Sequence, residues 1–198
     1  MEPKKKWLES HVSKSNPFAL RLVTFIVYSG VSLSSAFVTL LHLHKPSALT
    51  PPLPGFFHGL TKLYKDHQEY SSFGCLLLSL LKRKPSSSDV HVIVKDMLEF
   101  EKETISELLQ ICPPEATLAN NPIGLATLYA HLENLADNCL MEMGYGKLWK
   151  VETPLPWIKT ILGEDTSEKD QRSRNSVGAV KSPVKSADQA IFSTDFDF

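Results

Sequence analysis

Residues 18–43 read FALRLVTFIVYSGVSLSSAFVTLLHL, an apolar run that includes serine, threonine, tyrosine and glycine. Pro17 precedes the run, and Lys45-Pro46 follows it. Between Leu22 and Leu41 there is no charged side chain. A helix of this length is long enough to cross a bilayer. The interpretation of this run therefore decides between a helical bundle and a membrane protein.

Polar residues recur through the run at intervals of three or four, which places them on one side of a helix. These residues are Arg21, Thr24, Tyr28, Ser32, Ser35, Thr39 and His42. A wide apolar face with one polar stripe is typical of a central helix in a bundle, and this interpretation takes the stripe to face water. The hydroxyl groups also bring the free energy of membrane insertion to the order of zero. We favour the bundle; the alternative is a single-pass membrane protein anchored by residues 22–41.

The remainder of the chain also has the periodicity of helices. Helical spacing or stop signals predict helices at residues 18–43, 55–70, 72–83, 89–112, 122–143 and 154–163. Leu132 and Leu135 are expected in the core. No segment has the sustained alternation of a strand, and no Asn-Gly or Asp-Gly turn occurs. The fold class predicted is all-α, an irregular bundle of five or six helices with a disordered C-terminal tail.

Composition divides the chain into three parts. Residues 1–16 form a polar N-terminal segment, and residues 17–163 form the helical domain. Residues 164–198 are expected to be a disordered tail, because most of them are polar or charged and cannot bury enough apolar surface to offset their loss of entropy.

The charge is balanced, with 21 Lys and Arg against 22 Asp and Glu and a formal net charge of −1. This balance excludes a strong overall field for nucleic acid, so no direct binding of nucleic acid is expected. The three cysteines are widely spaced and odd in number, which suits a reducing compartment. The run Lys4-Lys5-Lys6, together with a Ser-Pro-x-Lys motif at residues 182–185, favours a nuclear or nucleocytoplasmic location.

Motifs for catalysis or for holding a nucleotide are absent from the sequence: there is no phosphate-binding glycine loop and no nucleophile elbow. The pair His42 and His44 is spaced two residues apart and does not share a helix face. His131 with Glu133, and the acidic residues near Glu101, are interpreted as solvated groups. We therefore expect no catalytic residue, no metal site, no cofactor and no small-molecule substrate.

The tail contains a phosphorylation motif. Ser182-Pro183-Val184-Lys185 matches the Ser-Pro-x-Lys pattern of proline-directed cell-cycle kinases. A phosphate on Ser182 would add nearly two negative charges beside two lysines. This motif predicts a phosphoprotein under cell-cycle control.

The chain ends in an aromatic and acidic peptide that has no core to join. The residues predicted to bind a partner are Ile191, Phe192, Asp195, Phe196, Asp197 and Phe198. Rings of this kind fill pockets on a partner, while the carboxylates meet Lys or Arg. The spacing predicts a docking peptide.

This ending resembles the subunit-anchoring tail of class I ribonucleotide reductase small subunits, which reads Phe-x-x-Asp-x-Asp-Phe in many members. The matching residues are Phe192, Asp195, Asp197 and Phe198. The resemblance implies docking on the large subunit of that enzyme. The family's Glu-x-x-His iron ligands are absent and the chain is shorter, so we expect that it is not a small subunit; a mimic of the tail that docks on the large subunit is a minor alternative. Gln189–Phe196 is also similar to sliding-clamp docking peptides, but without their adjacent aromatic pair.

These observations predict a non-enzymatic intracellular adaptor or regulatory subunit. It would bind protein partners, as part of a complex, through its helical surface and its C-terminal tail. Binding to a membrane is expected only in the alternative interpretation of residues 22–41.

Overall fold

The computed structural model describes residues 2–42, 53–111 and 124–158. Within these ranges the chain forms six α-helices and no β-strand, which confirms the all-α prediction. The helices are α1 (Glu2–Val12), α2 (Phe18–Val31), α3 (Ser34–His42), α4 (Pro54–Ser79), α5 (Ser87–Ile111) and α6 (Leu125–Glu142).

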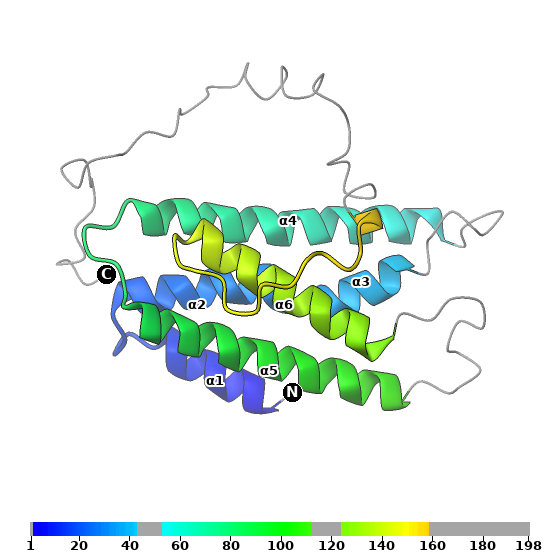
Figure 1. The fold of residues 1–198 in the computed structure, drawn as a ribbon, viewed down its shortest axis with the longest axis horizontal. Helices are drawn as coiled ribbons and strands as arrows, with labels where there is room; N and C mark the ends of the chain where they lie inside the picture. Colours follow the sequence, from blue (N-terminus) through cyan, green and yellow to red (C-terminus); the bar gives the residue numbers. More distant parts are fainter. Residues whose placement is uncertain (1, 43–52, 112–123, 159–198) are drawn as a thin grey trace, which may run out of the picture.

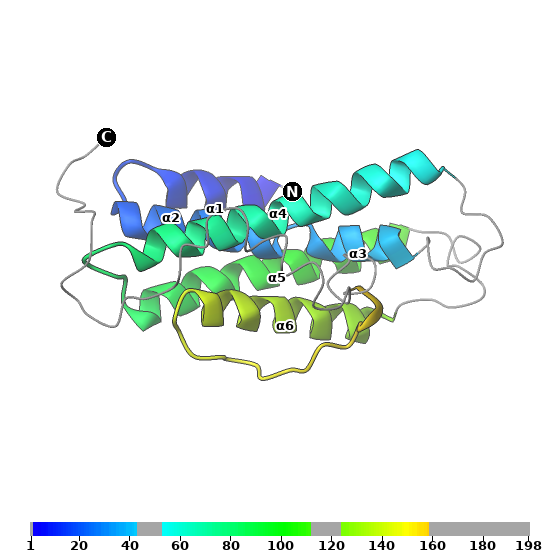
Figure 2. The ribbon, with the colours of Figure 1, turned by 90° about the horizontal axis from the view of Figure 1, so that it is seen from above.

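The helices lie roughly along one common axis. Figure 1 shows α4 along one edge of the bundle and α5 with α1 along the opposite edge, with α2, α3 and α6 between them. Figure 2, turned by 90°, shows the segment after α6 running back along the outside of that helix. The described part of the apolar run, residues 18–42, therefore lies at the centre of the bundle.

The apolar run forms two helices that are separated at Ser32 and Leu33. The amide of Ser32 closes α2 on the carbonyl oxygen of Tyr28 at 3.1 Å, and Leu33 has a φ of 64°, which is strained for a branched side chain. The segment has the length and hydropathy of a membrane span, but 72% of its apolar stretch is buried inside the bundle. Most apolar side chains of this segment thus belong to the hydrophobic core of the bundle.

Two clusters of buried side chains form this core. The larger one joins α1, α2, α5 and α6 to one end of α4, and includes Val23, Val27 and Met97. The smaller one lies around Phe37 and Tyr64, towards the other end of α4. The predicted core position of Leu132 is confirmed, since this side chain is fully buried, whereas Leu135 is only half-buried.

One predicted division between helices is wrong, and the N-terminal segment contains a helix that was not predicted. Residues 55–70 and 72–83 belong mainly to one helix, α4, because no proline interrupts the chain between them. The polar segment 1–16 contains α1, whose Trp7 is 9% exposed and donates from Nε1 to Asp96 Oδ2 at 3.1 Å. The predicted tail, residues 164–198, lies outside the described residues, so the boundary near residue 163 stays a prediction.

Candidate functional site

The polar stripe of the apolar run faces the interior, which contradicts the expectation that it faces water. Ser32 and Ser35 are each 2% exposed, and their hydroxyls donate to the carboxylate of Glu101 at 3.3 and 3.4 Å. The hydroxyl of Thr24 instead donates to the carbonyl oxygen of Leu20 on the same helix, at 3.0 Å. The break between α2 and α3 brings the two serines to Glu101.

Glu101 is a buried carboxylate and not a solvated one. Its side chain is 1% exposed on α5, and it forms an ion pair with Lys4 of α1, whose side chain is 17% exposed. Lys4 also lies over the ring of Tyr28. Because a buried charge is costly without a partner, this ion pair attaches the N-terminal helix to the centre of the bundle.

A second polar cluster lies where α2, α4 and α6 meet. The hydroxyl of Ser71 donates to the carbonyl oxygen of Ile26 at 3.1 Å and lies 3.5 Å from the sulfur of Cys139. A Cβ atom at Gly30 would come within 2.6 Å of the Ser71 hydroxyl, and one at Gly74 within 2.5 Å of Ile26. The helices pack closely here because these positions carry no side chain.

The thiols of this region are held in the protonated form. Burial raises the pKa of Cys75 to about 12, with a further contribution from Cys139 and Glu142. Burial likewise raises the pKa of Cys139 to about 11. Since the thiolate is the reactive form, neither cysteine has the character of a nucleophile.

An open groove of about 1040 Å³ lies between α4, α6 and the segment that follows α6. Its lining is mixed, with charged, amide and apolar side chains. The polar and charged residues are Gln68, Ser71, Ser72, His131, Asn134, Asn138, Glu142, Lys147, Lys150, Glu152 and Thr153.

His131 is the most unusual side chain of this groove. It is 3% exposed, and neither ring nitrogen has a hydrogen-bond partner among the described residues. Burial lowers the pKa of His131 to about 4, so the ring is neutral near pH 7. The predicted solvated pair with Glu133 is wrong, because Glu133 instead binds Lys102 of α5 at 2.9 Å.

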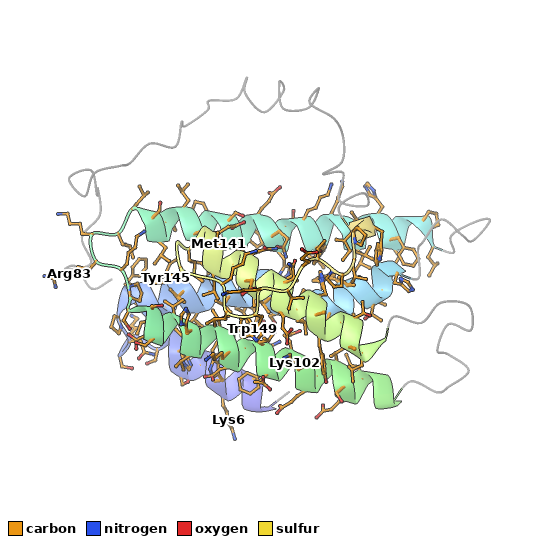
Figure 3. All side chains as sticks on the ribbon, viewed as in Figure 1. Lys6, Arg83, Lys102, Met141, Tyr145 and Trp149 are labelled. Atoms are coloured by element: carbon orange, nitrogen blue, oxygen red, sulfur yellow. The ribbon has the colours of Figure 1, made fainter. Side chains whose placement is uncertain are left out.

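The wall of the groove is fixed by Asp137, which is fully buried on α6. Its carboxylate accepts hydrogen bonds from the amides of Leu148, Trp149 and Lys150, at 2.8, 3.1 and 2.5 Å. Lys150 has a φ of 57°, a left-handed conformation that this carboxylate helps to hold. Figure 3 shows Trp149 on the segment that Asp137 holds against α6.

These groups do not make a metal centre. Within the part of the chain that the structure describes, no three His, Cys, Asp or Glu side chains are placed to hold a metal ion. Glu101 is engaged by Lys4, and Asp137 by backbone amides. The sequence also has no Glu-x-x-His, the iron-ligand pattern of the family that the tail resembles. An iron site of that kind does not fit the described helices.

The residues predicted to bind a partner, Ile191, Phe192, Asp195, Phe196, Asp197 and Phe198, and the predicted phosphorylation site Ser182, all lie outside the described residues. These assignments stay predictions.

Sequence reasoning missed Glu101 and His131, although a signal was present. Glu101 lies four residues from both Met97 and Ile105 on the apolar face of α5, and His131 lies between Leu128 and Leu132. A polar residue at such a position is a buried one.

The known proteins compared with this chain below all belong to one family. The family model described as "Ribonucleotide reductase, small chain" matches residues 1–156. A ribonucleoside-diphosphate reductase small chain of Nicotiana tabacum is 30% identical over 161 residues, which cover 81% of this chain and 46% of that protein. A ribonucleoside-diphosphate reductase small chain of Arabidopsis thaliana is 29% identical over 200 residues, which cover 98% of this chain and 57% of that protein.

The fold has a solved counterpart in the Rnr4 homodimer of Saccharomyces cerevisiae ribonucleotide reductase. The TM-score is 0.66 at 21% sequence identity, and the match covers 88% of this chain and 50% of that chain. The chain thus spans about half the length of the relatives that it matches.

These matches correct four predictions. The prediction of a non-enzymatic adaptor is wrong, because the relatives are named as chains of an enzyme. The prediction that the resemblance to the small chain is confined to the tail, and that the chain is not a small subunit, is wrong, because the similarity extends over residues 1–156. The membrane-anchor alternative fails as well, because the family match includes the apolar run. The exclusion of a small-molecule substrate loses its support, since the relatives are named as reductases of ribonucleoside diphosphates.

Proposed function

Since the chain belongs to the ribonucleotide reductase small-chain family, we propose that it works as a small-chain subunit in a ribonucleoside-diphosphate reductase. The observation that carries this proposal is the family match over residues 1–156, which includes every described helix. The names of the relatives, small chain and homodimer, describe parts of multi-chain assemblies. Protein partners are therefore part of the proposal.

The described helices contribute structure to this enzyme and not metal chemistry. They have no cluster of metal ligands, and the polar groups at their centre are engaged in ion pairs and hydrogen bonds with each other. We assign to them the support of the enzyme's assembly, with the C-terminal tail as the element that docks on the large subunit. The spacing of Phe192, Asp195 and Phe198 supports this assignment. The location in the nucleus or nucleocytoplasm stays a prediction.

The experiment is a reconstitution from purified components. Large subunit and a metal-loaded, full-length small chain of the same source are assayed for reduction of a ribonucleoside diphosphate, with and without this chain. We expect the chain to raise the rate. A rate that does not change, or that falls as the chain is added, contradicts the proposed role.

The contribution of the tail is measured separately, by binding of the chain to the large subunit in a calorimeter. The full chain should bind, and a chain without residues 191–198 should not. Phe196→Ala together with Phe198→Ala should have the same effect and leave the melting temperature unchanged. If the double variant binds normally, docking uses another surface.

A further inference from the structure

The groove between α4 and α6 has a buried end and an exposed end. The segment after α6, which forms one wall, runs back along that helix (Figure 2). The amide of Lys150 donates to Asp137 near the end of α6. The carbonyl oxygen of Val151 accepts from Asn134 Nδ2 at 2.7 Å, about one turn nearer the start. Leu155 then reaches the buried cluster at the start of α6, and this is the buried end of the groove.

His131 lies at the buried end, three residues after Leu128 on the same helix. Both of its ring nitrogens are buried without a hydrogen-bond partner among the described residues. By contrast, the side chains of Ser71, Ser72 and Asn134 donate to other groups of the bundle. Buried polar atoms are costly unless they are paired. The imidazole therefore has hydrogen-bonding capacity that the described residues do not use, and it lines the groove.

The buried end suits an uncharged, flat group. The imidazole of His131 is neutral near pH 7, so it offers one N–H donor and one acceptor nitrogen. Tyr64, Leu155 and Ile158, which also line the groove, are buried and largely apolar. The charged side chains of the lining are all exposed, so none of them compensates a charge at this end. The edge of a nucleobase has donors beside acceptors and an apolar face, which matches these neighbours.

The exposed end suits a phosphate. Lys147 and Lys150 both line the groove and are exposed, and neither forms an ion pair within the described part of the chain. Two ammonium groups match the double negative charge of a phosphate group. Glu152 lies between this end and Leu155 in the chain, and a carboxylate there is an acceptor for sugar hydroxyls. The carboxylate of Glu142 is engaged by the hydroxyl of Ser72 at 3.2 Å.

We propose that this groove binds a nucleoside monophosphate, with the base at His131 and the phosphate at Lys147 and Lys150. The volume of about 1040 Å³ is at the upper end of the range for small-molecule sites, so a base, a sugar and a phosphate fit together. All of these residues belong to one chain. The inference therefore does not rest on the proposed function.

The test is a calorimetric titration of the full chain with AMP and with UMP at pH 7.5, because the edge at His131 fits a purine or a pyrimidine. We expect at least one of the two nucleotides to bind with a Kd below about 1 mM. His131→Leu should raise this Kd at least tenfold, whereas the matched control His58→Leu, at an exposed position of α4, should leave it unchanged. Absence of binding by both nucleotides, or equal affinity of the His131 variant, overturns the proposal.

A second variant keeps the test decisive if His131→Leu does not fold. Lys147→Met with Lys150→Met changes two exposed side chains, and it should raise the Kd of the nucleotide roughly tenfold. Lys95→Met, at an exposed position of α5, is its control and should have no effect. An unchanged Kd for the double lysine variant places the phosphate elsewhere and overturns the proposed orientation.

The two ends of the site are separated by titration with the nucleoside alone. Adenosine or uridine should bind more weakly than its monophosphate, and its Kd should depend on His131 but not on the two lysines. Inorganic phosphate alone should not displace the nucleoside; if it does, the base does not occupy the buried end and the proposal is wrong. The titrations contain no large subunit, so their failure leaves the proposed role in the reductase standing, and a failed reconstitution leaves these titrations unchanged.

Discussion

Glu101 shows how one residue determines the position of an entire helix. Its carboxylate is almost completely buried, and Lys4 is its only cationic partner among the described residues. We expect Lys4→Met to lower the free energy of unfolding by about 2–4 kcal/mol, because it leaves a buried charge with only Ser32 and Ser35 as donors. Denaturation by urea measures this loss.

The neighbouring lysine provides the control. Lys5 also forms an ion pair, with Glu9, but the two side chains are 72% and 65% exposed. Lys5→Met should therefore cost less than about 0.5 kcal/mol. Adding Glu101→Gln to Lys4→Met should recover part of the lost stability. Equal effects of the two lysine substitutions would show that the Lys4–Glu101 ion pair contributes nothing beyond a surface contact.

His131 makes the stability depend on pH. Its pKa is lowered to about 4 in the folded chain from an ordinary value of 6.5. The unfolded chain therefore takes up the proton first, and the stability present above pH 6.5 is lost as the pH falls towards 4. Between pH 7.5 and pH 5 this loss is about 2 kcal/mol.

The variant His131→Leu should remove this part of the pH dependence, as followed by urea denaturation at the two pH values. His58→Leu is the control, because His58 is exposed on α4. If the slope with pH is the same in all three proteins, the ring of His131 is solvated in the folded state.

At the scale of the element, α4 contains a pair of glycines with opposite roles. A Cβ atom at Gly74 would meet the side chain of Ile26 at 2.5 Å, whereas one at Gly59 would have no atom within 4 Å. Alanine in place of Gly59 should stabilise the chain by up to ~1 kcal/mol through helix propensity alone. Alanine in place of Gly74 should destabilise it by about 1–3 kcal/mol, because α2 must move.

Thermal melting of the two alanine variants gives the comparison directly. The intrinsic gain in helix propensity is the same at both positions, so the difference in Tm isolates the packing of α2 on α4. A rise in Tm for both variants would show that the contact between these helices is loose.

Sequence periodicity was a good guide to α5 and α6, and a poor one to the apolar run. Both α5 and α6 have turn residues or prolines near their ends and one apolar face, so local pattern and tertiary packing agree. The break at Ser32 and Leu33 has no proline or glycine at the break itself, and it depends on contacts with Glu101, far away in the sequence. The spacing predicts the polar stripe but not the direction that it faces, because the buried partner of a serine cannot be recognised from spacing.

At the scale of the whole molecule, the chain should not hold iron in its described bundle. We expect the purified chain, exposed to ferrous iron under air and then desalted, to retain far less than one iron atom per chain. A full-length, iron-binding small chain is the control for the loading procedure, and metal analysis is the measurement. Stoichiometric retention of iron would mean that residues outside the described ranges complete a site.

Short sequence motifs do not identify the family of this chain. Members of a family at about 30% identity share helix positions and core volume, which no short pattern records. Only the predicted docking peptide at the end of the sequence resembles the family locally, through Phe192, Asp195, Asp197 and Phe198. The absence of Glu-x-x-His was read correctly, but it was wrong to conclude from it that the protein lies outside the family.

The close approach of α2 and α4 has a consequence for protein engineering. A designer who wished to install iron ligands between these helices would find the side chain of Ser71 already against Gly30, and the side chain of Ile26 already against Gly74. Two carboxylates and a cation need several ångströms that this packing does not leave. Conversion of the scaffold into a metalloprotein would therefore have to begin by widening the spacing of the helices, before any ligand was introduced.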